Sequence, residues 1–336
     1  MLRNTINIRK SMQTPSGEHL RRLLLIILLI SFYIEGCVSV NIPGPGPLTE
    51  HVVGGKGADK ILIIDISGII LDKEEENFMG LKTTSRLTAR IREELDKASE
   101  DNSVKAVILR INTPGGTVTT CDIINHELKN FKKKTGKIIV SEFMDIAASG
   151  GYYIAAASDR IVAHPTNITG SIGVVAYNIN ASGLLEKIGI TNETIKSGDK
   201  KDIGSPLRPI TSEEREILQG IIDSLYKRFL DVVSEGRKEI AREELKRIAD
   251  GRVYTAEQAL KLKLIDHIGY LDDAIEIAKG MAGIKDATII TYAMPSSYKS
   301  NIYAAQNIPN TVNLVNIDAG SFIGLPGMRF MYLWMP

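Results

Sequence analysis

The sequence predicts an α/β fold of recurring strand-then-helix units, followed by a helical C-terminal part. Two runs of β-branched and apolar residues, ILIIDISGII at 61–70 and VKAVILRI at 104–111, are typical of buried strands. The second run ends in the turn NTPGG at 112–116, and apolar residues then recur at helical spacing over 121–134. Because this strand, turn and helix order returns further on, a sheet-based architecture is favoured over a helical bundle or an all-β sandwich.

Each unit can be placed in chain order. The first strand starts at Lys60, and the apolar spacing that follows it predicts a helix. After the Gly115–Gly116 turn and its helix comes a short strand, then a small-residue helix that starts at Ser149. The expected elements are a strand from 60, a helix over 84–99, a strand over 104–111, a helix over 121–134, a strand over 137–143, a helix over 149–157 and a strand over 160–163.

The C-terminal part reads as helical. Thr211 and Glu214 have the spacing of a capping box, and a long helix follows whose apolar residues lie on one face. That face carries Ile217, Ile221, Leu225 and Phe229. Thr255 and Gln258 open another helix in the same way. Periodicity fades from about residue 286, and the chain ends in MRFMYLWMP, an apolar segment that we expect to dock in a groove or against a neighbour.

Composition excludes several classes of protein. With 43% hydrophobic and 24% charged residues over 336 positions, the chain is globular and not disordered. A formal net charge of +1 gives no bulk attraction for nucleic acid. Cys37 and Cys121 cannot form a disulfide framework and match no metal-ligand spacing, so they leave the redox compartment open.

The N-terminus contains a signal-type segment. Arg21 and Arg22 precede the apolar run 23–34, which is short for a membrane-spanning helix and is followed by Glu35 and Cys37. Two interpretations stay open: an uncleaved signal anchor, or a lipid on Cys37, although Glu35 departs from the usual pattern before a lipidated cysteine. We therefore divide the chain into an anchor segment at 1–37, a Pro/Gly-rich linker at 38–59, a catalytic domain at 60–285 and a tail at 286–336.

Ser149 is the first candidate for chemistry. It stands between small residues in AASGGYY, where a strand gives way to a helix and a substrate backbone can approach closely. The Gly150 amide is free to donate to an oxyanion there, and the glycine turn at 112–116 can turn a second backbone N–H toward a bound carbonyl. Taken alone, the serine motif is better explained by a plain helix-capping serine, and the glycine motif is explained equally well by a tight turn that needs positive φ.

A nucleophilic serine requires a base. None of the five histidines lies in a triad motif, and the best placed is His164, which follows a strand. The segment KSGDKKD at 196–202 offers Lys196, Lys200 and Lys201 instead. Bringing a lysine pKa from about 10.4 to near 7 costs roughly 4–5 kcal/mol, which burial can supply. From the residues alone, this segment fits a base in a groove or a solvated charge cluster.

Five motifs in the same order resemble the signal peptide peptidase A family of serine peptidases, family S49, over about 60–283. That family shares the fold of the Clp protease subunit and the crotonases, so the resemblance implies an α/β fold of repeated strand-strand-helix units with a helical C-terminal part. The motifs are INTPGGTV at 111–118, AASGGYYIA at 147–155, TGSIGV at 169–174, IKSGDKKDIGSP at 195–206 and DGRVYTAEQALKLKLID at 250–266. The family often has serine where this chain has Thr113, a small departure.

The resemblance implies a role for each motif residue. The nucleophile falls on Ser149 and the general-base lysine on Lys201, with Lys196 as the fallback. Gly116 and Gly150 become the oxyanion donors, and Ser171 becomes the residue that orients the lysine amine. No metal, nucleotide or other cofactor is implied.

The resemblance also implies a biological setting. The protein is expected to form a homo-oligomer whose substrate grooves lie at subunit interfaces. The serine and the lysine of one site are contributed by one protomer or by neighbouring protomers. Its substrates are signal-peptide fragments with small or apolar side chains, and its catalytic domain faces the periplasm or cell exterior. Three rivals are a crotonase-type acyl-CoA enzyme, a Clp-type Ser/His/Asp protease and a noncatalytic scaffold. The N-terminal signal, the lack of a triad histidine and the intact Ser149 and Lys201 speak against them in turn.

Overall fold

A computed structural model describes residues 48–72, 75–76, 82–84, 86–293, 301–303 and 329–335. All of them belong to one compact unit, Gly44–Pro336. The expected anchor segment at 1–37, including Cys37, lies outside the described residues.

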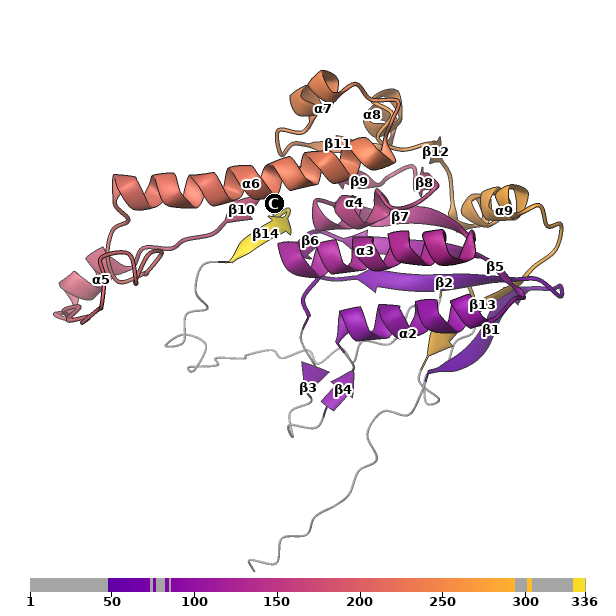
Figure 1. The fold of residues 1–336 in the computed structure, drawn as a ribbon, viewed down its shortest axis with the longest axis horizontal. Helices are drawn as coiled ribbons and strands as arrows, with labels where there is room; N and C mark the ends of the chain where they lie inside the picture. The colour runs from indigo at the N-terminus through magenta and orange to yellow at the C-terminus, as the bar shows by residue number, and fades with distance from the viewer. Residues whose placement is uncertain are drawn as a thin grey trace, which may run out of the picture. The chain divides into compact units, whose positions relative to one another are not determined.

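The described strands form one large sheet and two small ones (Figure 1). In the large sheet the order is β1-β13-β2-β5-β7-β8-β12, and β9 joins β7 to β11. Every pairing is parallel except β1 with β13 and β11 with β9. The bounds are β1 Thr49–Gly55, β2 Lys60–Ser67, β5 Val104–Thr113, β7 Ile138–Ala148, β8 Arg160–Ala163, β9 Ile168–Gly170, β11 Val253–Thr255, β12 His267–Ile268 and β13 Thr288–Ala293. The predicted α/β class is confirmed.

The small sheets and the helices complete the fold. One small sheet has the order β10-β14-β6, and the other pairs β3 with β4. Their bounds are β3 Glu75–Glu76, β4 Lys82–Thr84, β6 Gly115–Thr117, β10 Val175–Ala176 and β14 Phe330–Leu333. The helices are α2 Leu87–Glu100, α3 Val118–Thr135, α4 Gly150–Ala155, α5 Ser182–Lys187, α6 Ser212–Gly236, α7 Arg242–Ile248, α8 Ala256–Lys261 and α9 Leu271–Ala282.

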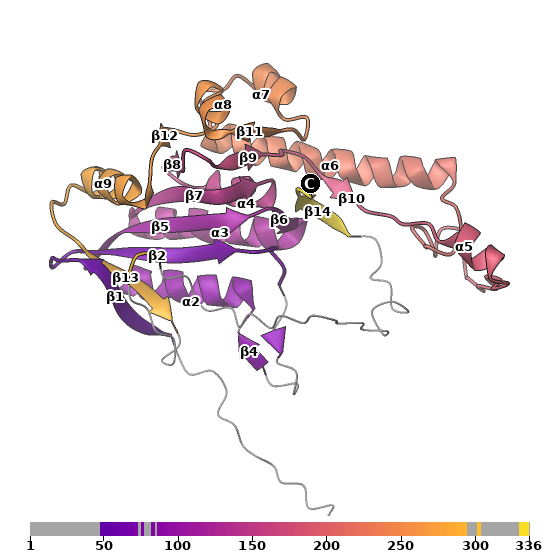
Figure 2. The same cartoon turned by 180° about the vertical axis from the view of Figure 1, so that it is seen from behind.

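The buried runs recognised in the sequence are strands that are covered on both faces. Along β2, Leu62 and Ile64 belong to the core shared with α2 and α3, whereas Ile61 and Ile63 belong to a second core shared with α9. Figure 2, which views the molecule from behind, shows the sheet in front of α2 and α3. A parallel sheet buried in this way requires continuous apolar strands instead of alternating ones.

Three features of the C-terminal part were also predicted. Thr211 caps α6 and Thr255 caps α8 through capping boxes with Glu214 and Gln258, so both are confirmed. The apolar end of the chain docks as β14, as expected. Strand β1 lies within the range that we assigned to the linker, and β13 and β14 lie within the range that we assigned to the tail.

One ionisable side chain, that of Glu142, is buried beside the second core and has no hydrogen-bond partner among the described residues. Glu142 on β7 is 0% exposed, and neither of its carboxylate oxygens has a hydrogen-bond partner in the described part of the chain. Burial, with a smaller contribution from the nearby Asp273, raises the pKa of Glu142 to about 9. This carboxyl is therefore protonated at neutral pH.

Candidate active site

Ser149 occupies the single residue between β7 and α4. Its φ of 51° is one that L-residues rarely adopt, and its N–H donates to the Gly170 carbonyl at 2.8 Å. A Cβ built on Gly150 would lie 2.5 Å from Cys121 Sγ, and one on Gly151 would lie 2.7 Å from Thr113 Cγ2. The two glycines after the serine are therefore required by close packing. The result is a sharp strand-to-helix turn with a serine at its apex.

The glycine turn after β5 approaches this apex. Gly115 has φ 110°, and a Cβ built on it would lie 2.8 Å from the Gly150 nitrogen. Only glycine at this position therefore allows the turn to come so close to Gly150. The Gly116 nitrogen lies 3.1 Å from the point where a Gly150 Cβ would stand. The structure therefore brings together the two predicted oxyanion donors, Gly116 and Gly150, beside Ser149.

Thr113 shapes this turn. Its hydroxyl donates to the Gly68 carbonyl at 2.5 Å and accepts from the Gly115 N–H at 3.0 Å. A serine hydroxyl could make both bonds, so the Thr113 departure from the family motif retains the chemistry that holds the turn.

Ser171 follows the strand that pairs with the end of β7. Strand β9 pairs with β7 so that Gly170 stands opposite Ala148, and Ser149 and Ser171 are the residues that directly follow these two strand ends. Ser171 also has positive φ, 49°, and donates its N–H to the Arg252 carbonyl at 2.7 Å. The residue expected to orient the base is therefore beside the expected nucleophile.

Lys201 is held elsewhere. It belongs to an arm, residues 177–211, that leaves the sheet after β10 and returns through α6. Its sequence neighbours fix the arm to the start of that helix, because Lys200 pairs with Glu213 at 2.5 Å and Arg208 joins Asp202 to Glu214. These bonds to Arg208 and to the Thr211 backbone lower the pKa of Glu214 to about 2. The Lys201 side chain is exposed.

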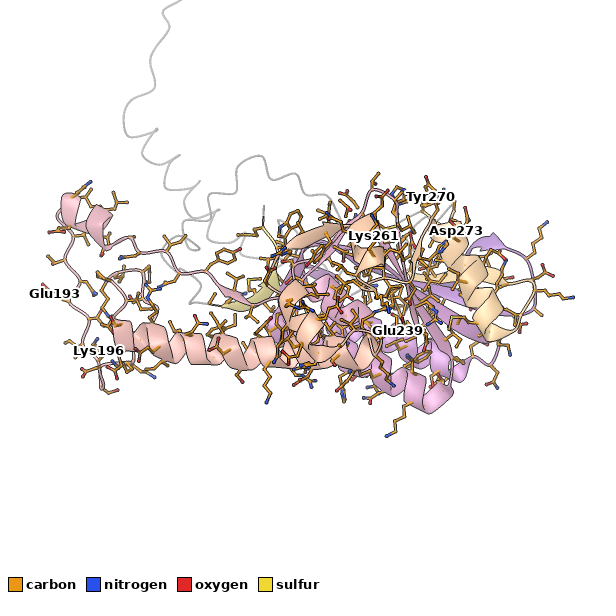
Figure 3. The ribbon with its side chains drawn as sticks, turned by 90° about the horizontal axis from the view of Figure 1, so that it is seen from above. Glu193, Lys196, Glu239, Lys261, Tyr270 and Asp273 are labelled. Atoms are coloured by element: carbon orange, nitrogen blue, oxygen red, sulfur yellow. The ribbon has the colours of Figure 1, made fainter. Side chains whose placement is uncertain are left out.

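The length of α6 separates the two predicted catalytic residues. Tyr153, one turn after Ser149, has its ring 5.0 Å from that of Phe229, which lies 15 positions after Glu214. At 1.5 Å per residue that is about 22 Å along the helix. Figure 3 likewise shows Lys196 at the far end of the arm, away from Lys261 and Tyr270. Within one chain, neither lysine reaches Ser149.

No base from the same chain takes the place of lysine. Among the described residues, none hydrogen bonds to the Ser149 hydroxyl. The His164 ring contacts Tyr270 edge-on at 4.9 Å and lies 2.9 Å from the Thr166 hydroxyl, while Lys196 pairs with Asp202 at 2.8 Å. Ser149 and the two predicted oxyanion donors, Gly116 and Gly150, thus lie together without a base, and we call these three residues the half-site.

Comparison with known proteins shows the family of this chain. The model of peptidase family S49 matches residues 131–285. A protein of Enterococcus faecium, named as a signal peptide peptidase SppA, is 39% identical over 250 residues, which cover 74% of this chain and 72% of that protein. The chain belongs to peptidase family S49.

Other relatives of this S49 peptidase come from several different organisms. A protein of Methanocaldococcus jannaschii named as a protease is 33% identical over 81% of this chain and 86% of its own length. The chloroplastic serine protease SPPA of Arabidopsis thaliana is 34% identical over 72% of this chain and 36% of its own length. Among solved structures, a membrane-bound stomatin-specific protease, 1510-N, matches with TM-score 0.39 and 15% identity over 66% of this chain and 85% of its own.

Sequence reasoning missed the aromatic residues around the S49 half-site. Tyr153 and Phe229 are buried beside Ser149, and Tyr332 from the C-terminal strand completes the cluster. The YY pair after the glycines and the MYLW segment were visible as sequence signals, but nothing in the spacing showed that they meet. Cys121 lies under Gly150, and burial raises the pKa of its thiol, so it stays uncharged and inert.

A cavity of about 490 Å³ opens next to the half-site. It is lined by Ser171 and Val175 on one side, Tyr226 on another, and Leu333 and Trp334 from the C-terminal strand. Within the described ranges no helix is long and apolar enough to cross a membrane, and no group of side chains is arranged to hold a metal ion.

Proposed function

We propose that this S49 peptidase is a serine endopeptidase in which Ser149 and Lys201 act as a dyad across a subunit boundary. The observation that carries the proposal is the apex serine with the Gly116 and Gly150 amides beside it. This is the arrangement that an acyl-transfer site requires: a nucleophile next to two fixed backbone donors for the developing oxyanion.

The absence of a base beside Ser149 in the single chain supports assembly of several subunits. Lys201 lies in the arm, which is bonded to the start of α6, and about 22 Å of that helix separates Glu214 from Phe229 beside the half-site. A second copy can bring that lysine to the cavity beside Ser171. The exposed apolar side chains of the arm and the start of α6 supply the surface for such contact, and they are Ile179, Leu184, Ile188, Ile190, Ile195, Leu207, Ile217 and Ile221.

The reaction then runs in two steps. A neutral Lys201 amine takes the Ser149 proton as the hydroxyl oxygen attacks the peptide carbonyl, and the Gly116 and Gly150 amides hold the oxyanion. Lys201 returns the proton to the leaving amine as the C–N bond breaks. Water, deprotonated in the same way, hydrolyses the acyl-enzyme. Enclosure of the amine at a subunit interface removes it from water, which favours its neutral form.

We propose the physiological setting on the resemblance and on relatives named as signal peptide peptidases. The substrates are residual signal peptides and other membrane-associated peptides released from preproteins. The N-terminal segment anchors the chain, by lipid on Cys37 or by a retained helix, with the catalytic domain outside the cytoplasm.

The experiment that tests the dyad is subunit complementation with a fluorogenic peptide. Ser149→Ala and Lys201→Ala are each expected to be inactive, and Lys196→Ala to stay active as the matched control. Co-assembled one to one, the two inactive variants should regain about a quarter of wild-type activity, since random assembly places an intact serine beside a neighbour's intact lysine at that frequency.

Two results would contradict the proposal in different ways. Full activity of Ser149→Ala would show that Ser149 is not the nucleophile. Inactivity of the mixture, with assembly shown by light scattering, would place the base within the same chain as the serine.

A further inference from the structure

One of the five sequence motifs takes no part in the proposed dyad. The segment DGR at 250–252 begins the last of these motifs and leads into β11. The Ser171 N–H donates to the Arg252 carbonyl at 2.7 Å, and the next residue, Val253, stands opposite Gly170 where β11 pairs with β9. The motif is therefore bonded directly to the residue that is expected to orient the lysine.

The two charged side chains of this motif bind each other. Arg252 Nε lies 2.8 Å and 2.9 Å from the two Asp250 oxygens, and Arg252 Nη2 lies 2.5 Å from Oδ2. The Arg252 N–H also donates to Asp250 Oδ1 at 3.2 Å, so the carboxylate closes the turn at Gly251, where φ is 90°. Hydrogen bonds from the Arg252 side chain lower the pKa of Asp250. Asp250 is therefore a carboxylate at neutral pH, and one cation balances its charge.

Hydrogen bonds from two tyrosines fix the backbone that enters this turn. The Tyr226 hydroxyl, from α6, donates to the Ala249 carbonyl at 2.6 Å. The Tyr254 hydroxyl, from β11, donates to the Ile248 carbonyl at 2.7 Å. The turn is thus held by contacts that do not involve its own charged side chains, so neutral side chains at 250 and 252 should leave its backbone in place.

Asp250 lies on the wall of the cavity that Ser171 also lines. In the proposed assembly, this cavity receives the Lys201 amine of a second copy. A carboxylate close to an amine favours the ammonium form, which cannot take the Ser149 proton. An unbalanced Asp250 would therefore oppose the dyad, although its carboxylate helps to close the turn.

The exposure of the pair agrees with a role at a subunit boundary. The Asp250 and Arg252 side chains are 43% and 62% exposed in the single chain. An ion pair this exposed contributes little to the stability of one chain. Its effect grows when a second subunit covers the cavity, because charges interact more strongly when water is excluded.

We propose that Arg252 is a positioning residue of the dyad: its carbonyl holds Ser171, and its guanidinium balances Asp250 so that the Lys201 amine of the neighbouring subunit stays neutral. This inference rests on the proposed function and gives the DGR motif a role in it. The arginine acts through the lysine and the serine, without touching the substrate.

Other titratable side chains also line the cavity. They are Tyr177 on the arm and Asp223 and Tyr226 on α6, whereas the described end of the chain contributes leucine, tryptophan and methionine, which do not titrate. All of these side chains stay unchanged in the variants below. They therefore cannot produce a difference between one variant and another.

The test is the pH dependence of kcat/KM for the fluorogenic peptide, measured on the assembled full-length protein. Activity rises with pH as the lysine loses its proton, so the midpoint of that rise reports the pKa of the lysine. Arg252→Gln leaves Asp250 unbalanced and should move the midpoint up by about one pH unit. Asp250→Asn leaves Arg252 unbalanced and should move the midpoint down. The variant with both changes should return to the wild-type midpoint within about 0.3 pH unit.

Two further variants separate charge from structure. Arg252→Lys keeps the positive charge without the guanidinium fork, and it should keep the wild-type midpoint. Lys246→Gln on α7 is the matched control, since Lys246 pairs with Glu243 at 3.1 Å, is 52% exposed and lies outside the described lining of the cavity. It should not move the midpoint. Light scattering shows whether each variant assembles, and each single variant has its own expected direction, so every assembled variant gives a reading.

Two outcomes would overturn the inference. Midpoints that stay at the wild-type value in Arg252→Gln and Asp250→Asn would show that the pair does not act on the lysine. A variant with both changes that is more impaired than either single variant, and not restored, would make the motif purely structural. Lys201→Ala is measured in parallel. Its full activity would refute the proposed dyad, whereas an inactive Lys201→Ala with unmoved midpoints would refute this inference alone.

Discussion

Ser149 has a backbone conformation that costs free energy to maintain. At φ 51° and ψ −110°, the Cβ of any L-residue is strained, and such strain at active sites typically costs about 1–3 kcal/mol. The neighbouring Gly150 and Gly151 are packed so closely that neither could carry a side chain. This packing holds the turn and fixes the backbone conformation of Ser149.

Two substitutions separate strain from chemistry. Ser149→Gly and Ser149→Ala should both be inactive, but Ser149→Gly should be more stable than Ser149→Ala by about 1 kcal/mol, since glycine adopts positive φ without a Cβ penalty. Chemical denaturation of the two inactive variants measures the difference. Equal stability would mean that the turn carries no strain.

Glu142 predicts a pH dependence of stability. Its pKa is raised to about 9 by burial, above the value near 4.5 expected for the unfolded chain, so between these limits the folded state binds the extra proton. The free energy of unfolding should therefore fall as pH rises across this window, by up to about 1.4 kcal/mol per pH unit. Glu142→Gln keeps the shape without the titration.

The measurement is urea denaturation of wild type and Glu142→Gln at pH 5, 7 and 9. We expect the variant to gain stability relative to wild type as pH rises. Parallel curves for the two proteins would show that Glu142 ionises in the folded state as easily as in water.

At the scale of elements, α6 has two different halves. Phe229 and Val233 near its end are buried, whereas Ile217 and Ile221 near its start are 43% and 39% exposed, although all four follow the same helical periodicity. The sequence pattern predicted the apolar stripe but not where the helix leaves the sheet. An apolar stripe that continues into solvent is typical of a protein interface.

This stripe predicts the effect of a charge. Ile217→Glu should prevent assembly and peptide cleavage while the thermal midpoint of the isolated chain stays within about 2 °C, because the side chain is not buried in one chain. Ile123→Glu on α3 is the matched control, since Ile123 is 40% exposed on another helix. Light scattering and activity are read together. Assembly that survives Ile217→Glu would exclude this surface.

Which elements could be foreseen depends on what stabilises them. The strands β2 and β5 bury apolar side chains on both faces, and the caps at Thr211 and Thr255 are local, so both leave a mark in the sequence. Strands β1 and β14 pair with distant edges and alternate little, so their place depends on contacts hundreds of residues away. The candidate site follows the same division: Ser149, Gly116 and Gly150 come together at the ends of neighbouring strands, whereas Lys201 lies in the arm and does not reach them within one chain.

At the scale of the whole molecule, the folded unit begins before the catalytic motifs. Strand β1 covers the β13 edge, and Leu48 and Val53 are buried against the sheet. A chain that starts at Leu48 should keep the wild-type thermal midpoint. One that starts at Lys60 should lose several kcal/mol, because each buried aliphatic side chain contributes about 1.5–3 kcal/mol. Calorimetry of both chains decides, and equal midpoints would show that β1 is dispensable.

The slot that β14 fills has a consequence for handling the protein. Once vacated, β6 and β10 each present a row of unsatisfied main-chain groups to solvent, and such bare edges recruit any extended chain nearby. Copies of a chain that lacks β14 would then be prone to pair through these edges into strand-paired aggregates. Strand β14 covers both edges and so opposes aggregation. Protein that has lost its C-terminal residues should therefore lose solubility faster on storage than the intact protein.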